Sequence, residues 1–211
     1  MDSEGINLGR RARHPDIVAI GASAGGVEAI GALLSELPDD LPATVLVVLH
    51  RPVHLPSYLP EVLERKTRLP VHLAEDGFPL VRATCLVAPS DRHLTITPEL
   101  TVRLLPDHFY SGHTVDILFE SLARSFGRRT IGVVLTGMLK DGTLGLMAIK
   151  QAGGFALVQS PSDSAHPSMP ENAIRHNGDI DFVGTTKELA QEIRRLVERT
   201  PPQLLPMDAG H

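Results

Sequence analysis

The feature that most constrains the fold is a glycine-rich turn that directly follows a short apolar run. The run Asp16 to Ile20 is followed by GASAGG, Gly21 to Gly26, and then by apolar residues at helical spacing, from Val27 to Leu34. This pattern predicts a strand, a tight turn and a helix. Free backbone N–H groups and the positive end of the helix dipole meet at the centre of such a turn, where Ser23 stands. A serine there can be a nucleophile beside an oxyanion hole, or it can simply cap the helix.

Composition restricts the chain to an ordinary globular protein. It has 211 residues, of which 42% are hydrophobic and 21% charged, enough for one α/β domain with a sizeable core. Apolar runs such as Ala43 to Leu49 are too short to cross a bilayer, and the first fifteen residues lack the apolar segment of a secretory signal. We therefore expect no membrane insertion.

Cysteine content and net charge indicate the compartment of the protein and the class of partner that it binds. The single cysteine, Cys85, excludes an internal disulfide and fits a cytoplasmic protein. It lies within a predicted strand, which favours a buried structural role over that of a nucleophile. A formal net charge of −5 argues against nucleic acid as the main partner.

Strand and helix patterns alternate along most of the chain. This alternation predicts an α/β fold with a doubly wound, mostly parallel, Rossmann-like sheet. We expect a flexible leader over residues 1–15, one domain over 16–199 and a flexible tail over 200–211. Three short β-rich segments in the middle predict inserted antiparallel hairpins: Thr84 to Ala88, Arg92 to Thr97 and Leu100 to Leu105.

Three polar residues follow three predicted strands at their carboxyl ends, where open α/β sheets bind ligands. They are Ser23, His50 and Asp141. An imidazole can take the serine proton, an acid can fix the imidazole tautomer, and N–H groups around Ser23 and Ala24 can hold an oxyanion. Each also has a structural explanation, because serine and aspartate cap helices and a histidine can be a buried polar residue. Their coincidence at three strand ends favours a hydrolase triad.

Other candidates are weaker, and we expect neither a metal nor a cofactor. A dinucleotide site would need a glycine and an acid where Ser23 and His50 stand. The tract Gln159 to Pro167 either borders the site or is only a connector. The remaining histidines lack the spacing of metal ligands, among them His93, His108 and His113.

Together, these residues resemble the catalytic domain of the chemotaxis protein-glutamate methylesterase CheB. The resemblance is carried by GASAGG, the strand ending in His50, the stretch Val115 to Phe119, LTGMLKDG from Leu135 to Gly142, and Met169 to Ile174. It extends from Asp16 to Val183.

The resemblance implies specific roles. It places the nucleophile, base and acid of the family on Ser23, His50 and Asp141, with Ala24, Gly25 and Met138 near the oxyanion or the substrate. It implies hydrolysis of γ-glutamyl methyl esters on chemoreceptor helices, with deamidation of receptor glutamines as a second activity.

Two alternatives stay open beside this interpretation. One is a serine hydrolase that acts on a different ester or amide, and the other is a catalytically silent module that docks on a receptor or a methyltransferase. Fifteen leading residues cannot hold the receiver domain of the family. We therefore expect a stand-alone esterase, regulation by a receiver domain on another chain, or a piece of a longer protein.

Three residues depart from the pattern of the family. Ala24 follows the nucleophile where the family commonly has threonine, and Arg51 follows the histidine in place of methionine. Leu139 stands where the family has glycine. If that glycine has a positive φ, a leucine must change the turn or accept strain.

Overall fold

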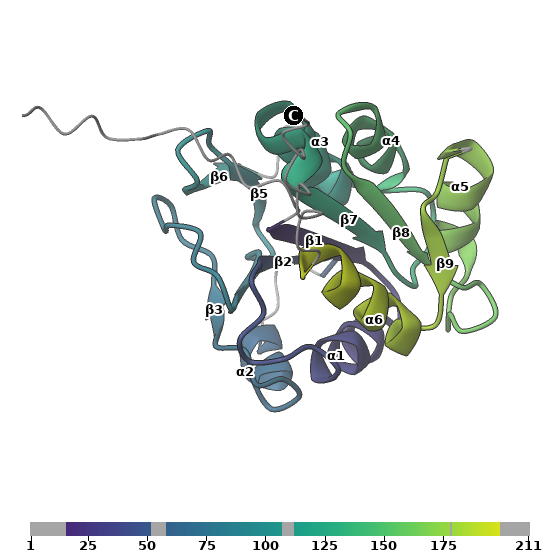
Figure 1. The fold of residues 1–211 in the computed structure, drawn as a ribbon, viewed down its shortest axis with the longest axis horizontal. Helices are drawn as coiled ribbons and strands as arrows, with labels where there is room; N and C mark the ends of the chain where they lie inside the picture. The colour runs from purple at the N-terminus through teal and green to yellow at the C-terminus, as the bar shows by residue number, and fades with distance from the viewer. Residues whose placement is uncertain (1–15, 52–57, 107–111, 178, 199–211) are drawn as a thin grey trace, which may run out of the picture.

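A seven-stranded sheet forms the centre of the molecule (Figure 1). The computed structural model describes residues 16–51, 58–106, 112–177 and 179–198, so the predicted leader and the predicted tail lie outside the described residues. The strand order is β3-β4-β2-β1-β7-β8-β9, and every neighbouring pair is parallel. The predicted doubly wound α/β fold is confirmed.

The elements alternate along the chain as βα units. The strands of the sheet are β1 Ile17–Ala22, β2 Thr44–Leu49, β3 Val71–Leu73, β4 Thr84–Val87, β7 Thr130–Val134, β8 Phe155–Gln159 and β9 Phe182–Gly184. The α-helices are α1 Gly26–Ser35, α2 Leu59–Glu64, α3 Thr114–Phe126, α4 Thr143–Gln151, α5 Ser168–Asn177 and α6 Thr186–Val197. A separate hairpin is formed by β5 Arg92–Ile96 and β6 Val102–Pro106.

Helices cover both faces of the sheet because its central strands are apolar along their whole length. All residues of β1, β2 and β7 are buried, as expected for parallel strands covered on two sides. One core layer joins the sheet to α1, α2 and α6, which lie below it in Figure 1. The second layer joins it to α3, α4, α5 and the hairpin. The site described below lies beside the second layer.

One predicted hairpin segment belongs to the main sheet instead. Thr84–Val87 forms β4, which pairs in parallel with β2 and with β3, so the prediction of an antiparallel strand there was wrong. The segment Cys85 to Val87 is a continuous apolar run that is buried on both sides, as an internal parallel strand requires. The other two segments form the predicted hairpin, which packs on α3, where Ser121 Oγ accepts a hydrogen bond from Ile96 N at 3.3 Å.

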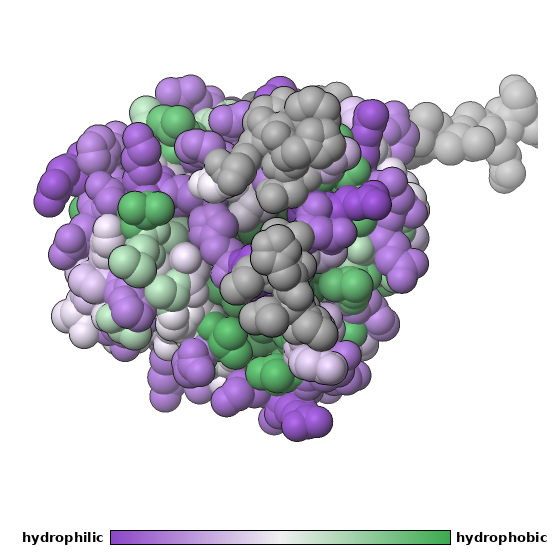
Figure 2. Space-filling model, turned by 180° about the vertical axis from the view of Figure 1, so that it is seen from behind, coloured by the Kyte–Doolittle hydropathy of each residue, from purple (hydrophilic) through white to green (hydrophobic). Residues whose placement is uncertain are grey.

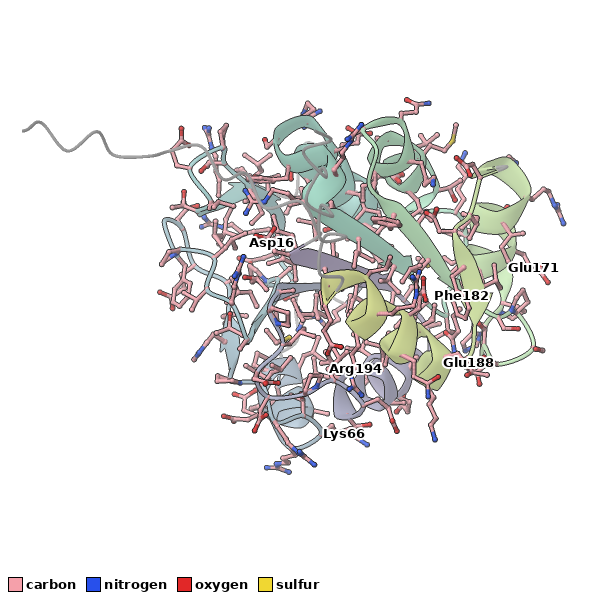
Figure 3. The ribbon with its side chains drawn as sticks, viewed as in Figure 1. Asp16, Lys66, Glu171, Phe182, Glu188 and Arg194 are labelled. Atoms are coloured by element: carbon pink, nitrogen blue, oxygen red, sulfur yellow. The ribbon has the colours of Figure 1, made fainter. Side chains whose placement is uncertain are left out.

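A partly buried ion pair fixes the amino ends of the central strands. Asp16, labelled in Figure 3, precedes β1 and accepts two hydrogen bonds from the guanidinium of Arg129, at 2.8 and 2.7 Å. Because parallel strands start at one edge of the sheet and end at the other, this pair lies at the edge opposite to Ser23. Its role is therefore structural.

The face of the molecule seen from behind Figure 1 carries both apolar and polar side chains. Figure 2, seen from behind Figure 1, shows green patches separated by hydrophilic purple side chains. Among the helices that the structure describes, none is long and apolar enough to cross a membrane.

Candidate active site

Ser23 lies in the turn between β1 and α1, directly after the last residue of the strand. Its N–H donates to Thr136 O at 3.0 Å, and its carbonyl accepts from Gly26 N at 2.8 Å. The N-cap of α1 is Gly25, with a positive φ of 73° and no side-chain capping bond. Ser23 is therefore not the helix cap, and its hydroxyl is left for another use.

His50 lies beside Ser23 at the carboxyl edge of the sheet. Ala22 of β1 pairs with Leu49 of β2, and His50 N donates to Ala22 O at 3.2 Å, so the two residues follow paired positions on adjacent strands. The hydrogen bond expected between Ser23 Oγ and the His50 ring is not formed among the described residues. Such catalytic hydrogen bonds commonly tighten only when substrate is bound.

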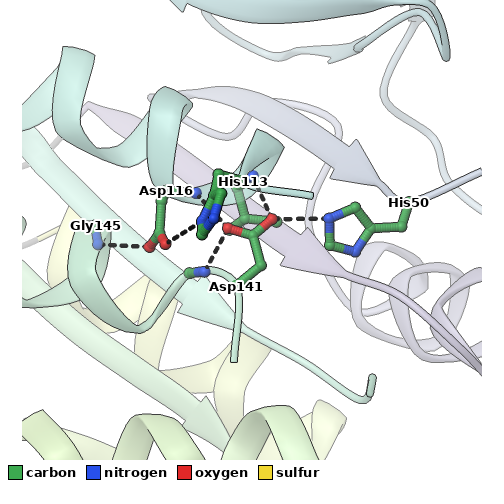
Figure 4. Close-up of polar contacts among 7 residues, drawn as sticks. His50, His113, Asp116, Asp141 and Gly145 are labelled. Atoms are coloured by element: carbon green, nitrogen blue, oxygen red, sulfur yellow. Dashed lines mark hydrogen bonds and ion pairs between the residues drawn. The ribbon is translucent and has the colours of Figure 1, made fainter. Parts of the chain in front are cut away.

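His50 and Asp141 are in direct contact (Figure 4). His50 Nε2 lies 2.8 Å from Asp141 Oδ2, although the ring N–H is not well aligned with that oxygen. The aspartate side chain is only 2% exposed and the histidine 28%. With Nε2 as the protonated nitrogen, Nδ1 is the ring atom that can accept a proton from Ser23.

Asp141 is held by the amino-terminal ends of two helices. Its oxygens accept hydrogen bonds from Val115 N at 2.8 Å, Asp116 N at 2.9 Å and Gly142 N at 2.9 Å. Burial raises the pKa of Asp141, but the contact with His50 and the N–H donors of Val115 and Asp116 outweigh burial, so the pKa is lowered. The carboxylate is therefore ionised, as a partner for an imidazolium must be.

Asp116 is a second buried acid that the sequence analysis did not single out. Its Oδ1 accepts from Gly145 N of α4 at 2.7 Å, and its Oδ2 lies 3.6 Å from His113 Nδ1 (Figure 4). Burial raises its pKa most, the Gly145 bond opposes this and the charge of Asp141 raises it further, to about 6. An acid among apolar residues at helical spacing, Val115, Leu118 and Phe119, is the signal that would have found it.

His113, Asp116 and Asp141 offer ligand atoms within 4.8 Å of one another. The oxygens of Asp141 already accept three backbone N–H groups, however. Positive dipole ends surround the acids, which is an environment for holding a carboxylate rather than a cation.

Backbone donors gather around Ser23. Within the described residues, the N–H groups of Ala24, Gly25 and Met138 donate to no acceptor. Thr136 Oγ1 donates to Ala24 O at 3.1 Å and so fixes the peptide that joins Ala24 to Gly25. The arrangement leaves N–H groups free for a developing negative charge next to the serine.

Gly137 allows the turn after β7 to approach the serine. A Cβ at this position would lie 2.8 Å from Ser23 Cβ and 2.1 Å from Met169 Sδ. No side chain fits in that space. Glycine is therefore required for β1, the turn and α5 to meet.

The tract Gln159 to Pro167 borders the site. His166 N donates to Thr136 Oγ1 at 2.8 Å, and Gly137 N donates to His166 O at 2.9 Å. Gln159, itself 2% exposed, accepts a hydrogen bond from Thr136 N at 2.8 Å. The tract is therefore not only a connector, because it contacts the residues of the site.

Of the three residues that depart from the family pattern, Leu139 and Arg51 have visible structural consequences. Leu139 adopts a positive φ of 69°, so the turn accepts strain. Arg51 donates through Nη2 to Ala88 O, and burial lowers the pKa of its guanidinium. A pocket of about 190 Å³ beside His50 and Arg51 extends to Ser90, Arg92 and Thr114.

Cys85 is not a candidate nucleophile. It is fully buried in β4, and burial raises its pKa to about 12, so the thiol stays protonated.

Comparisons with known proteins point to one family. The family model described as CheB methylesterase matches residues 18–193. A Pseudomonas aeruginosa protein named protein-glutamate methylesterase/protein-glutamine glutaminase 2 is 41% identical over 188 residues, which are 87% of this chain and 54% of that protein. A Lawsonia intracellularis protein named protein-glutamate methylesterase/protein-glutamine glutaminase is 34% identical over 89% of this chain and 53% of its own length.

The chain thus spans about half the length of the curated relatives it matches. In contrast, the crystal structure of the Thermotoga maritima CheB methylesterase catalytic domain is covered over 98% of its length, with a TM-score of 0.80, 28% identity and 86% of this chain aligned. By sequence and by fold, this chain belongs to the CheB methylesterase family.

Proposed function

We propose that the chain is a protein-glutamate methylesterase in which Ser23 is the nucleophile, His50 the general base and Asp141 the acid that orients it. The observation that supports this most is the 2.8 Å contact between His50 Nε2 and the buried Asp141, beside Ser23 at the same sheet edge. The family and the names of the relatives support the choice of ester. The substrate is a methylated glutamate on a chemoreceptor helix.

The reaction proceeds in two steps. Ser23 Oγ attacks the ester carbonyl while its proton moves to His50 Nδ1, and the N–H groups of Ala24, Gly25 and Met138 hold the oxyanion. Collapse of the tetrahedral intermediate transfers that proton to the leaving oxygen, releases methanol and leaves an acyl-serine.

Water then cleaves the acyl-serine by the reverse sequence of proton transfers. It gives its proton to His50, attacks the acyl carbon and leaves the glutamate as a free carboxylate, while Ser23 regains a proton. A glutamine side chain would follow the same route and release ammonia, which accounts for a second, deamidating activity.

Regulation and compartment belong to the same proposal. We place the enzyme in the cytoplasm, where the single buried cysteine stays reduced. A receiver domain or a methyltransferase on another chain is a candidate partner.

Methanol release from fully methylated chemoreceptor membranes tests the function. We expect release by the wild-type protein and a fall of about 10³-fold or more in Ser23→Ala, because removal of a nucleophile leaves only binding and the oxyanion donors. Ser35→Ala is the matched control, since the Ser35 hydroxyl donates to Ala32 O within its own helix and bonds no other described residue. Circular dichroism checks that both variants are folded.

Other outcomes would select another function. Release by Ser23→Ala at the wild-type rate would reject the assigned nucleophile. Turnover of small esters without methanol release from receptors would favour a hydrolase with a different substrate. No turnover and no labelling of Ser23 by a fluorophosphonate would favour a silent docking module.

A further inference from the structure

The turn between β7 and α4 presents its side chains to solvent at the rim of the site. Met138 is 58% exposed and Leu139 77%, and Lys140 next to them is also exposed. One residue earlier, Gly137 lies so close to Ser23 that a Cβ would be 2.8 Å from Ser23 Cβ. A polypeptide that brings an ester to Ser23 therefore lies next to this turn.

Leu139 is held in its strained conformation by α5. Its φ of 69° falls in the left-handed region, which residues other than glycine, asparagine and aspartate rarely adopt. Its carbonyl accepts hydrogen bonds from Asn172 Nδ2 at 2.8 Å and Ser168 Oγ at 3.4 Å. The backbone of the turn is thus fixed by α5 while the leucine side chain remains in water. Strain that the surrounding structure maintains is typical of residues that contact a ligand.

From this geometry we infer that Leu139 and Met138 form an apolar contact that docks the helix carrying the methylated glutamates, and that Lys140 pairs with acidic side chains of the same helix. This inference rests on the proposed function. Charge complementarity identifies the occupant, because a helix whose methylation sites are glutamates presents carboxylates wherever the ester is absent. Its apolar stripe supplies the surface that covers the leucine.

Two substitutions test the side chain without changing the turn. Asparagine and glycine both tolerate a positive φ, so Leu139→Asn and Leu139→Gly keep the backbone conformation and remove only the apolar group. Val81→Asn is the matched control. Val81 is 47% exposed, and its carbonyl accepts from the Thr44 hydroxyl at the amino end of β2, the edge opposite to the site.

Kinetics on two substrates provide the first readout. We expect kcat/KM on methylated receptor helices to fall about tenfold in both Leu139 variants, chiefly through a higher KM. The reason is that binding no longer buries the leucine side chain away from water. The loss on a small soluble methyl ester should be much smaller, and Val81→Asn should match the wild type on both substrates. Equal losses on the two substrates, or no loss on the receptor, would overturn the inference.

Binding without turnover provides the second readout. In the Ser23→Ala background, Leu139→Asn should raise the Kd for methylated receptor helices about tenfold, whereas Val81→Asn should not. Normal hydrolysis with a Kd that does not depend on Leu139 would reject the docking role and leave the function intact. A Kd that depends on Leu139 in a protein that releases no methanol would reject the function and keep the docking surface.

Discussion

Among single residues, Thr136 joins several parts of the site: the turn of Ser23, β8 and the tract that contains His166. Its hydroxyl donates to Ala24 O at 3.1 Å and accepts from His166 N at 2.8 Å. Its backbone makes two further hydrogen bonds: Thr136 O accepts from Ser23 N, and Thr136 N donates to Gln159 Oε1. The hydroxyl thus orients the peptide between Ala24 and Gly25, one of the peptides proposed to hold the oxyanion.

Replacing this hydroxyl tests its positioning role. Thr136→Val keeps the shape of the side chain, and we expect kcat to fall about tenfold with KM nearly unchanged, because full loss of an oxyanion donor costs about 10²–10³ and here the donor is only displaced. Thr136→Ser keeps the hydroxyl and should recover most of kcat. Steady-state kinetics on the small ester measure both. A rise in KM at constant kcat, or no recovery with serine, would contradict the role.

The sequence allowed the residues of the proposed triad to be selected but not the groups that support them. The carboxyl ends of parallel strands converge on one edge, so Ser23, His50 and Asp141 could be predicted as neighbours from the order of strands. Thr136 and Asp116 act through hydrogen bonds to backbone atoms far away in the chain. Such partners are known only once the turn and the helices are placed in space.

At the scale of elements, two acids cross-link the first turns of α3 and α4. Asp141, in the turn before α4, accepts from Val115 N and Asp116 N of α3, and Asp116 accepts from Gly145 N of α4. The N–H groups in the first turn of a helix have no partner within that helix. Each of the two helices donates such groups to an acid at the start of the other helix. This junction places Asp141 against His50.

The ionisation of Asp116 should make this junction sensitive to pH. Its pKa is raised to about 6 in the folded protein, from 3.8, so between these values the folded state keeps a proton that the unfolded state has lost. Folding stability from this group therefore decreases as pH rises from about 4 to about 6. Asp116→Asn does not titrate and keeps an oxygen for Gly145 N.

We expect Asp116→Asn to gain stability relative to the wild type as pH rises, by about 1–3 kcal/mol between pH 4 and pH 7.5, at about 1.4 kcal/mol per pKa unit. Urea unfolding at several pH values measures the difference. A difference that stays constant with pH would show that Asp116 titrates normally.

Sequence patterns identified most elements but missed some at the edge of the sheet. The strand β1 and the helix α1 were found from an apolar run and from apolar residues at helical spacing. The helix α5 was not predicted, because few of its described apolar side chains are fully buried, Met169 and Ala173 among them, and a proline stands in its first turn. The strand β9 has three residues at the sheet edge, too few to show a period.

At the scale of the whole molecule, one sheet serves two core layers with different duties. The layer with α1, α2 and α6 packs one face of the sheet, and α1 begins at the turn of Ser23, whereas the layer with α3 and α4 carries Asp116 and donates hydrogen bonds to Asp141. Each layer buries one of the two faces of the same strands. We therefore expect the domain to unfold in one cooperative step.

Cavities placed in the two layers should separate stability from activity. Ile193 in α6 and Leu122 in α3 are both fully buried, one in each layer. Truncation of either to alanine should cost about 2–5 kcal/mol, and each kcal/mol lowers Tm by about 2–4 °C in a domain of this size. Calorimetry should show one transition for both variants, since either cavity weakens packing on the shared strands.

Activity at 25 °C should then distinguish the two layers. Ile193→Ala should keep kcat within about twofold of the wild type, whereas Leu122→Ala should lower kcat several-fold, because a shift of α3 moves the N–H donors of Asp141 and a displacement of about 1 Å is costly in catalysis. Equal kcat in the two variants would mean that α3 positions Asp141 independently of its packing. Two separate calorimetric transitions would mean that the layers are not coupled through the sheet.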